Sequence, residues 1–489
     1  MKKLRRLLFR LLILALLITV GIIAFNTFKF SSKQLQVAPV EKIGIGPESI
    51  ERMAEAIRIP TLSYDDRVDT AAFLAFNAYL DSTYALVDSL LEHKTVGQFS
   101  HVYRWPGRRP GLKPILLIGH IDVVPVEGKS LEEWSVRPYS GLIRDDYLWG
   151  RGTLDDKINV IGALEAVKLL LTEGYQPERS IYLAFGHDEE VGGKHGAQAI
   201  AQWFKQQGLE FEYVLDEGML IIKDAMPGLD RPLAMIGAAE KGYTTLTLQV
   251  KLEDGGHSSM PLGESAIGIL SKAVATLEAQ PFPAKIEGLA ADLFDHCGPE
   301  MSMPHKAVFA NLWLFESLVL QQLTASPGSN AMVRTTTAPT ILEAGVKDNI
   351  LPTSANAKIN FRILPGETVE SVTEYVRQTI DDERVKVMSD LNFSSNPSKI
   401  SGTETFGFSV IRKTAQEIFP EVITAPSLVI AATDSRHYGE VAASIYRFQP
   451  LRLLQADLKR IHGIDERISL DNYRNAVRFY RQLMLNSSK

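Results

Sequence analysis

Four polar clusters stand beside short apolar runs in the first half of the chain, and each cluster carries carboxylates. The clusters are GHIDVVP at 119–125, GRGTLDDK at 150–157, GHDEEVGG at 186–193 and VLDEG at 214–218. Short apolar runs are typical of buried strands, and helical runs alternate with them along the chain. This alternation predicts an α/β fold with a mostly parallel sheet. Ligands bind beyond the carboxyl ends of the strands in such a sheet, so the clusters predict a site there.

The residue pattern outlines the elements of this fold. Helical recurrence predicts helices at 48–57, 69–91, 158–171, 196–207, 266–280, 368–382, 408–418 and 470–485. Strand-like runs lie at 101–104, 114–119, 180–186, 213–215, 244–252, 355–363 and 427–431. The runs at 244–252 and 355–363 alternate between apolar and polar residues, as half-exposed strands do. We therefore expect a separate α+β layer inserted into the first domain.

These changes of character divide the chain into five segments. We expect an N-terminal segment 1–33, a linker 34–47, a first catalytic part 48–240, an inserted domain 241–391 and a second catalytic part 392–489. The linker is short, polar and without periodicity. Residues 281–334 are rich in Pro, Met and Phe, and they show no period from which an element can be predicted.

The N-terminal segment combines a basic start with a long apolar run. An apolar stretch at 11–25 follows the cations Lys2, Lys3, Arg5, Arg6 and Arg10. A signal peptide has this pattern too, but the small-x-small cleavage site is missing, because Ile22 lies two places before Ala24. A buried core helix is a third interpretation, and five neighbouring cations argue against it.

We therefore favour an uncleaved membrane anchor. The 22 residues from Leu7 to Phe28 can span a hydrocarbon core of about 30 Å if Arg10 reaches the lipid headgroups. Positive residues favour the cytoplasmic side, which places the body of the protein outside the cytoplasm. Cleavage of the segment would instead release a secreted protein.

The composition of the chain excludes several classes of function and of metal site. The 489 residues carry a net charge of −6 and no Lys/Arg stripe, so nucleic acid is not an expected partner. Cys297 is the only cysteine, which excludes an internal disulfide and a thiolate cluster. A metal would therefore be bound by His, Asp and Glu, a donor set that suits zinc. Two metal ions about 3.5–4 Å apart can polarise a carbonyl and activate water.

Each cluster alone has an ordinary structural interpretation. His120 fits a buried, hydrogen-bonded histidine, with Asp122 placed to accept its other ring N–H. Asp155 fits a helix N-terminus, where capping and the helix dipole stabilise carboxylates. The acids at 188–190 fit a solvated turn, although three adjacent carboxylates are costly to gather without a cation. Together the clusters favour a metal centre, to which RIHGIDE at 460–466 adds a second histidine.

The ordered set of motifs resembles a known enzyme family. HIDVVP, GRGTLDDK, HDEE, LDEG, GHSSMP, TDSRHY and RIHGIDE are similar to motifs of the di-zinc aminoacylase and carboxypeptidase family. The resemblance covers residues 48–485 and is strongest to the branch of the N-fatty-acyl-amino-acid synthase/hydrolases and carboxypeptidase S. It implies a catalytic domain of the zinc-peptidase type with an inserted, ferredoxin-like lid domain at 241–391.

The resemblance also implies a role for each residue of the metal centre. It assigns two zinc ions to five ligands, with Asp155 bridging both, His120 and Asp216 completing one site, and Glu190 and His462 completing the other. Glu189 would be the general base that takes a proton from water and passes it to the leaving nitrogen. Asp122 would orient the imidazole of His120.

The inserted domain would contribute groups that contact the substrate. His257 would donate to the oxyanion of the tetrahedral intermediate, either from the same chain or from a partner subunit in a homodimer formed through the lid. Arg362 and Asn349 would bind the substrate carboxylate, and Arg436 would line the same pocket. Apart from the resemblance, His257 fits an ordinary loop histidine and Arg362 a solvent-facing strand residue.

The sequence thus predicts a zinc-dependent hydrolase of the amide bond next to a free amino-acid carboxylate. The favoured substrate is an N-acyl amino acid, long acyl chains included, and the reverse condensation is open as well. A carboxypeptidase or dipeptidase acting on short peptides is the first alternative. A membrane-anchored scaffold without catalysis is the second, and the presence of Glu189 with all five ligands argues against it.

Overall fold

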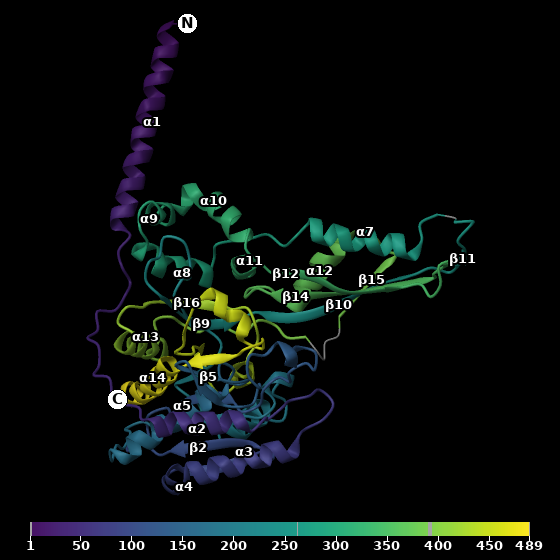
Figure 1. Cartoon of the computed structure of the whole chain (residues 1–489). Helices are drawn as coiled ribbons and strands as arrows, with labels where there is room; N and C mark the ends of the chain where they lie inside the picture. The colour runs from purple at the N-terminus through teal and green to yellow at the C-terminus, as the bar shows by residue number, and fades with distance from the viewer. Residues whose placement is uncertain (1, 262, 390–393, 489) are drawn as a thin grey trace.

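The computed structural model describes residues 2–261, 263–389 and 394–488 (Figure 1). Its helices are α1 (Lys2–Lys29), α2 (Pro47–Arg58), α3 (Thr70–Thr83), α4 (Ala85–Leu90), α5 (Lys157–Thr172), α6 (Ala197–Gln206), α7 (Ala266–Ala279), α8 (Leu289–Cys297), α9 (His305–Phe309), α10 (Leu312–Thr324), α11 (Pro327–Val333), α12 (Val369–Ile380), α13 (Phe406–Ile418) and α14 (Leu470–Ser487). Its strands are β1 (Glu92–Val96), β2 (Ser100–Trp105), β3 (Ile115–His120), β4 (Leu142–Arg144), β5 (Tyr147–Trp149), β6 (Ile181–Gly186), β7 (Tyr213–Asp216), β8 (Ile221–Ile222), β9 (Leu233–Glu240), β10 (Gly242–Lys251), β11 (Gly256–His257), β12 (Thr336–Ala344), β13 (Ile350–Leu351), β14 (Ser354–Ile363), β15 (Val385–Ser389), β16 (Ile423–Val429), β17 (Ile445–Arg447), β18 (Arg452–Leu453) and β19 (Arg467–Ser469).

The central strands of the main sheet are buried on both faces. Every residue of β3 and β6 is buried. Leu117 of β3 packs in the core that contains α5 and α14, whereas its neighbour Leu116 packs on the other side with α6. Burial of such a side chain stabilises the fold by about 1.5–3 kcal/mol relative to its exposure. Helices on both faces therefore explain the continuous apolar sequence of these strands.

The main sheet is mixed. Its order is β1-β2-β6-β3-β7-β17-β9-β8-β18, with β16 paired to β9. The central pairs β6–β3, β3–β7 and β7–β17 are parallel, whereas β1–β2, β2–β6, β17–β9 and β8–β9 are antiparallel. The predicted mostly parallel sheet is thus corrected to a mixed sheet, in which the outer pairs β16–β9 and β8–β18 are again parallel. One cause is the tight turn at Gly97 and Gln98, which has positive φ and is too short for a parallel crossover.

A second sheet, in the order β12-β14-β10-β15, is antiparallel throughout. Residues of β10 and β14 alternate between buried and partly buried, so one face is covered. Helices α7 and α12 cover that face, and Leu246, Phe361, Leu270 and Val376 belong to its separate core. The α+β character expected after residue 241 is therefore present. The domain end expected at 391/392 lies outside the described residues.

Residues 289–333, for which no period could be read, form the helices α8 to α11, of 9, 5, 13 and 7 residues. Helix α8 packs on β16 of the main sheet, with Leu293 and Cys297 in a shared core with Ile423. Pro299, Pro304 and Pro327 interrupt the segment and keep its helices short. Helix α8, which falls within the expected insert, therefore lies against the main body rather than on the second sheet.

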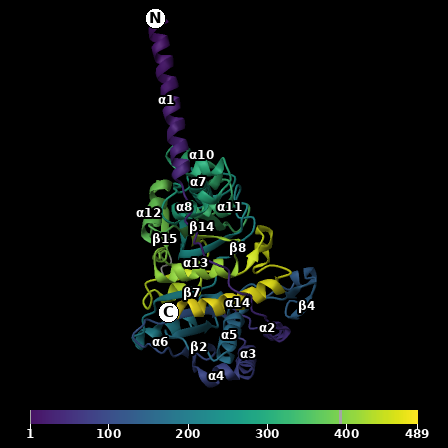
Figure 2. The same cartoon turned by 90° about the vertical axis from the view of Figure 1, so that its left-hand side faces the viewer.

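Helix α1 projects from the body at the end where α9 and α10 lie (Figures 1 and 2). In length and apolar composition it could cross a membrane, a property that a signal sequence shares. The expected linker has neither helix nor strand up to residue 46, and it is bonded along the body. Gln34, for example, accepts from the backbone N–H of Thr424, and Arg412 donates to the carbonyl of Lys33.

Candidate metal centre

Loops from four distant parts of the chain meet at the carboxyl ends of the central strands. His120 is the last residue of β3, and Glu190 lies in a short 3-10 turn (Glu189–Val191) that follows the adjacent parallel strand β6. Asp155 precedes α5, and His462 follows a 3-10 turn near the C-terminus. The parallel register that pairs His120 with Gly186 puts the loops after β3 and β6 at one edge.

The side chain of Asp155 lies between two imidazoles. Its Oδ1 is 3.0 Å from Nε2 of His120, and its Oδ2 is 3.1 Å from Nε2 of His462. The same Nε2 of His462 is 3.1 Å from Oε2 of Glu190. Each carboxylate oxygen of Asp155 thus faces a different imidazole. This is the arrangement that a carboxylate shared between two cations requires.

The structure places Asp216, the fifth predicted ligand, close by but not in this cluster. It ends β7, the strand next to β3, and its two oxygens accept from the backbone N–H groups of Glu217 and Ser435. Among the described residues, the ligand atoms of His120, Asp155 and Glu190 all lie within 4.8 Å of one another. Asp216 does not belong to this group.

Asp122 is hydrogen-bonded to several residues of the cluster and its surroundings. Its Oδ2 accepts from the Ser63 hydroxyl and the Glu190 N–H, and its Oδ1 accepts from the Glu189 N–H. Nδ1 of His120 is 3.0 Å from the backbone oxygen of Asp122 and 3.3 Å from Oδ1, so its N–H is shared between them. Burial alone would raise the pKa of Asp122, but these bonds outweigh burial and hold its pKa below the usual value.

The neighbouring carboxylate, Asp156, holds the backbone of His120, a role that the sequence did not predict. It is fully buried, and its Oδ2 accepts from the backbone N–H of His120. Its Oδ1 accepts from the side-chain amides of Asn159 and Gln449. The adjacent acids of GRGTLDDK therefore separate, with Asp155 in the cluster and Asp156 behind the backbone of β3. Sequence alone does not distinguish the two, because both precede the same helix.

A buried ion pair ties the histidine loop to the loop of Asp155. Arg151 donates 2.5 Å to Oε2 of Glu466 and 2.9 Å to the carbonyl of His462. Oε1 of Glu466 accepts from the backbone N–H groups of Gly152 and Leu154. Glu466 is the last residue of RIHGIDE, a motif from which only His462 was expected to act. Its place four residues after the histidine in the same motif is the signal that could have indicated a supporting role.

Glu189 lies beside the cluster, and its pKa is raised well above the usual value. Burial is the main cause, and the charges of Asp434, Glu190 and Asp155 add to it, while His120 opposes it. Cations next to this carboxylate would reverse the balance, because they favour its ionised form.

Two of the predicted substrate groups lie away from the cluster. His257 belongs to β11, at the far tip of the arm that carries the second sheet (Figure 1). It is exposed, and its Nδ1 is 2.7 Å from the hydroxyl of Ser259. The carbonyl of Asn349 accepts from the Ser258 N–H in the same tip. The structure thus brings His257 and Asn349 to each other but not to the four clustered residues.

The other two predicted substrate groups, Arg362 and Arg436, approach each other from different parts of the fold. Arg436 donates 3.0 Å to the carbonyl of Gly192, directly after the turn of Glu189. Arg362 of β14 stacks on Tyr243, with 4.9 Å between its guanidinium carbon and the ring centre. Burial lowers the pKa of Arg362, and the positive charge of Arg436 lowers it further. Arg436 therefore stands beside the turn of Glu189, and Arg362 lies close enough for the charge of Arg436 to act on it.

The donor set of the cluster fits zinc. Imidazole nitrogens and carboxylate oxygens are the zinc ligands open to a chain without thiolate clusters. Oε1 of Glu190 is buried and has no hydrogen-bond partner in the described part of the chain, as expected of an oxygen that binds a cation. A second group, Asp81, Asp88 and His93, is more exposed, and His93 already pairs with Asp88.

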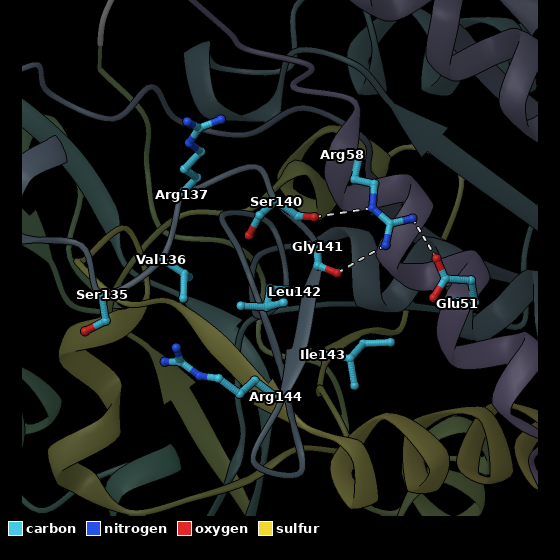
Figure 3. Close-up of a pocket in the computed structure, with 10 residues that line it drawn as sticks. All are labelled: Glu51, Arg58, Ser135, Val136, Arg137, Ser140, Gly141, Leu142, Ile143 and Arg144. Carbon is cyan, nitrogen blue, oxygen red and sulfur yellow. Dashed lines mark hydrogen bonds and ion pairs between the residues drawn. The ribbon is translucent and has the colours of Figure 1, made fainter.

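A separate hollow of about 450 Å³ lies elsewhere on the main body (Figure 3). Ten residues line it: Glu51, Arg58, Ser135, Val136, Arg137, Ser140, Gly141, Leu142, Ile143 and Arg144. Figure 3 shows Arg58 bonded to Glu51 and to the backbone oxygens of Ser140 and Gly141. Because the lining contains none of the clustered residues, this hollow is distinct from the candidate metal centre.

Comparisons with known proteins agree with the motifs. The chain is 42% identical to the probable carboxypeptidase S-like 2 of Dictyostelium discoideum, over 96% of this chain and 92% of that protein. It is 40% identical to the human N-fatty-acyl-amino acid synthase/hydrolase PM20D1, over 89% of this chain and 87% of that protein.

The fold agrees as well. The crystal structure of the metallo-carboxypeptidase Sso-CP2 from Sulfolobus solfataricus matches with a TM-score of 0.64 at 18% identity, over 91% of this chain and all of that one. Residues 116–486 match the sequence profile of peptidase family M20/M25/M40. The resemblance inferred from the motifs is thereby confirmed, and the chain belongs to peptidase family M20/M25/M40.

Proposed function

We propose that the protein is a zinc-dependent amidohydrolase that cleaves N-fatty-acyl amino acids and also catalyses the reverse condensation. The observation that carries the proposal is the position of Asp155, whose two oxygens face the imidazoles of His120 and His462. The substrate class follows from PM20D1 relatives at about 40% identity over most of the chain.

Five side chains would hold two zinc ions. Asp155 would bridge them, with His120 and Asp216 on one ion and Glu190 and His462 on the other. When bound, the ions polarise the scissile carbonyl and make water acidic enough to react near neutral pH. The unpartnered oxygen of Glu190 and the position of Asp216 beside β3 support this assignment.

Glu189 would be the general base. Its neighbour Glu190 would bind zinc, whereas the carboxylate of Glu189 would not. Glu189 can therefore accept a proton from water and return it to the leaving nitrogen. Asp122 fixes the backbone of both residues and the ring of His120. This shared anchor keeps the base at a fixed position relative to the metal ligands.

Arg362 and Arg436 would bind the free carboxylate of the substrate. The positive charges of Arg362 and Arg436 repel each other, and a substrate carboxylate bound by both would offset this repulsion. Asn349 would assist, and His257 would stabilise the oxyanion of the tetrahedral intermediate. Because His257 and Asn349 sit in an exposed tip, this requires closure of the arm or its insertion into a partner.

The second sheet would accordingly act as a lid, within an inserted domain at 241–391 between catalytic parts 48–240 and 392–489. It also offers a surface for a homodimer. Among the described strands β12 pairs with β14 alone, and its residues from Pro339 to Ala344 are exposed. An open strand edge of this kind can pair with a second copy. Pairing there would fit a partner-supplied His257.

Segment 1–33 would be an uncleaved membrane anchor, joined by the linker 34–47 to a body outside the cytoplasm. Asn311 supports this, because its fully buried side chain bonds to Asn26 and to the carbonyl of Ile23 on α1. Cleavage after Asn26 would remove these two partners and expose the buried side chain of Asn311 to water. A secreted form would follow if cleavage nevertheless occurred.

The substrate class is tested with purified full-length protein and two substrate sets. Release of an amino acid is measured from N-oleoyl amino acids and from dipeptides, with and without a chelator. We expect turnover of the N-oleoyl compounds that is lost with the chelator. Turnover of dipeptides alone would favour the carboxypeptidase alternative, which the Dictyostelium relative's name supports.

Glu189→Gln tests catalysis against a scaffold role. The change removes the basic oxygen but no zinc ligand, so we expect two bound zinc ions and a rate lower by about 10²–10⁴-fold. Atomic absorption gives the metal content, and a coupled assay gives the rate. Fewer than one zinc ion in the wild type, or an unchanged rate in the variant, would contradict the proposed chemistry.

A further inference from the structure

Helix α10 exposes several large apolar side chains. Trp313, Leu314 and Leu318 have 59%, 46% and 59% of their surface exposed. We call these three residues the α10 surface. Glu316 is the only charged residue in the 13-residue helix. A helix face so poor in charge is unusual in contact with water, and contiguous apolar patches indicate an interaction site.

The position of α10 relative to α1 indicates what contacts this surface. Asn311 immediately precedes α10, and its side-chain amide donates 3.2 Å to the carbonyl of Ile23. Asn26 donates 2.9 Å to Oδ1 of Asn311, and Trp313 donates 3.1 Å to the same oxygen. Both views show α10 at the end of the body from which α1 emerges (Figures 1 and 2).

These bonds fix the depth of α10 relative to the apolar span. An α-helix rises about 1.5 Å per residue, so a span ending near Phe28 places Ile23 more than one turn inside the hydrocarbon boundary. The start of α10 is held at the level of Ile23 and therefore cannot stand clear of the headgroups. Tryptophan favours this zone, because its ring is apolar and its N–H is polar.

We propose that the α10 surface inserts into the outer leaflet of the lipid bilayer that α1 spans. The proposal rests on the proposed membrane anchor and deepens it, since the body would be held against the membrane rather than tethered above it. The bound body could then take long-chain N-acyl amino acids directly from the lipid phase, where their acyl chains partition.

The tryptophan content of the chain allows a direct test. Trp105, Trp134 and Trp149 are buried, Trp203 is partly buried, and α1 contains no tryptophan. The full-length protein is reconstituted into phosphatidylcholine vesicles with or without brominated acyl chains, which quench tryptophan fluorescence on contact. We expect brominated lipid to quench the wild type, and Trp313→Phe to remove the quenched component. Equal fractional quenching of both proteins, or of neither, would overturn the proposal.

Alkaline washing of the same vesicles separates the anchor from the docking. A chain that resists washing while Trp313 is not quenched would overturn the docking alone. A chain that washes off would overturn the anchor and, with it, the docking. A stable dimer whose contact protects Trp313 from the brominated lipid would assign the surface to a second copy and would equally overturn the proposal.

A matched pair of variants tests the consequence for catalysis. Leu314→Glu with Leu318→Glu charges the α10 surface, whereas Leu74→Glu with Leu90→Glu charges two leucines of α3 and α4, each 55% exposed. We expect the first pair to raise KM severalfold for N-oleoyl substrate in vesicles, with kcat unchanged. Short, water-soluble N-acyl substrates should be unaffected, and so should the control pair. Equal effects of the two pairs would contradict membrane delivery of the substrate.

Discussion

Replacing Asp122 with Asn tests whether one buried carboxylate holds the centre together. Its two oxygens receive the Ser63 hydroxyl, the N–H groups of Glu189 and Glu190, and a share of the His120 ring N–H. In Asn one oxygen becomes an NH₂ group, which cannot accept. At the Oδ1 position it loses the Glu189 N–H and the His120 ring N–H, and at the Oδ2 position it loses the Glu190 N–H, since the Ser63 hydroxyl can turn to accept from it. In both orientations the remaining bonds also lose their charged acceptor. Bonds to a charged group contribute about 1.5–3 kcal/mol each. We therefore expect the free energy of unfolding of the metal-free chain to fall by about 3 kcal/mol or more.

The same change should weaken zinc binding through His120. Loss of the partner that orients a ligating histidine typically lowers metal affinity by about 10–100-fold, or about 1.4–2.8 kcal/mol. Urea unfolding of the metal-free chain gives the first quantity, and competition with a chromophoric chelator gives the second. Ser63→Ala is the control, because it removes one donor and keeps the carboxylate. Unchanged zinc affinity in Asp122→Asn would refute the reasoning, whatever the change in stability.

Three further predictions concern the loops and the substrate. In the metal-free chain, hydrogen bonds to Asp155 and Glu190 raise the pKa of His462 to about 10. Protonation of this ring therefore stabilises the metal-free fold. The stabilisation is complete below the usual pKa of 6.5 and is lost as the pH rises through about 10. Zinc requires the neutral ring, so calorimetry in buffers of different ionisation heat should show proton release near pH 7, and none in its absence would contradict the assignment. Removing the carboxylate with Glu466→Ala leaves the charge of Arg151 buried, so urea unfolding should show a loss of about 3–5 kcal/mol, and a smaller loss when Arg151→Met is added. Arg362→Lys should raise KM for substrates with a free carboxylate but not for their amides, and equal effects on both would remove Arg362 from the substrate site.

The sequence predicts those parts of the metal centre whose residues directly follow a buried strand. β3 reads ILLIGH and β6 reads IYLAFG, and both are buried throughout. A continuous apolar strand leaves little choice of ends, so the histidine of GHIDVVP and the acids of GHDEE had to emerge at the same edge once the strands paired in parallel. The elements around these motifs therefore appear close to their expected bounds.

The arrangement of the remaining parts depends on distant contacts that no local period encodes. The helices α8 to α11 are short and interrupted by proline, so the segment showed no period from which to predict them. The bond of Asn311 to α1 joins residues 288 positions apart. Asp156 is the same residue type as Asp155 but bonds to the backbone N–H of His120, whereas Asp155 faces the imidazoles of His120 and His462. Position in space, and not residue type, separates a supporting carboxylate from one in the cluster.

Charge balance gives the strongest physical reason to expect cations at this centre. Burial raises the pKa of Glu189 well above its usual value, and it does the same for Glu217. Burial would also raise the pKa of Asp155, but hydrogen bonds from His120 and His462 outweigh it and keep this carboxylate ionised. Protonating Glu189 would relieve its burial cost, but a protonated carboxyl cannot serve as a base. Divalent cations held by Asp155 and the two imidazoles would favour the ionised form of Glu189 without binding its oxygens. Glu189 could then act as a base although it is buried.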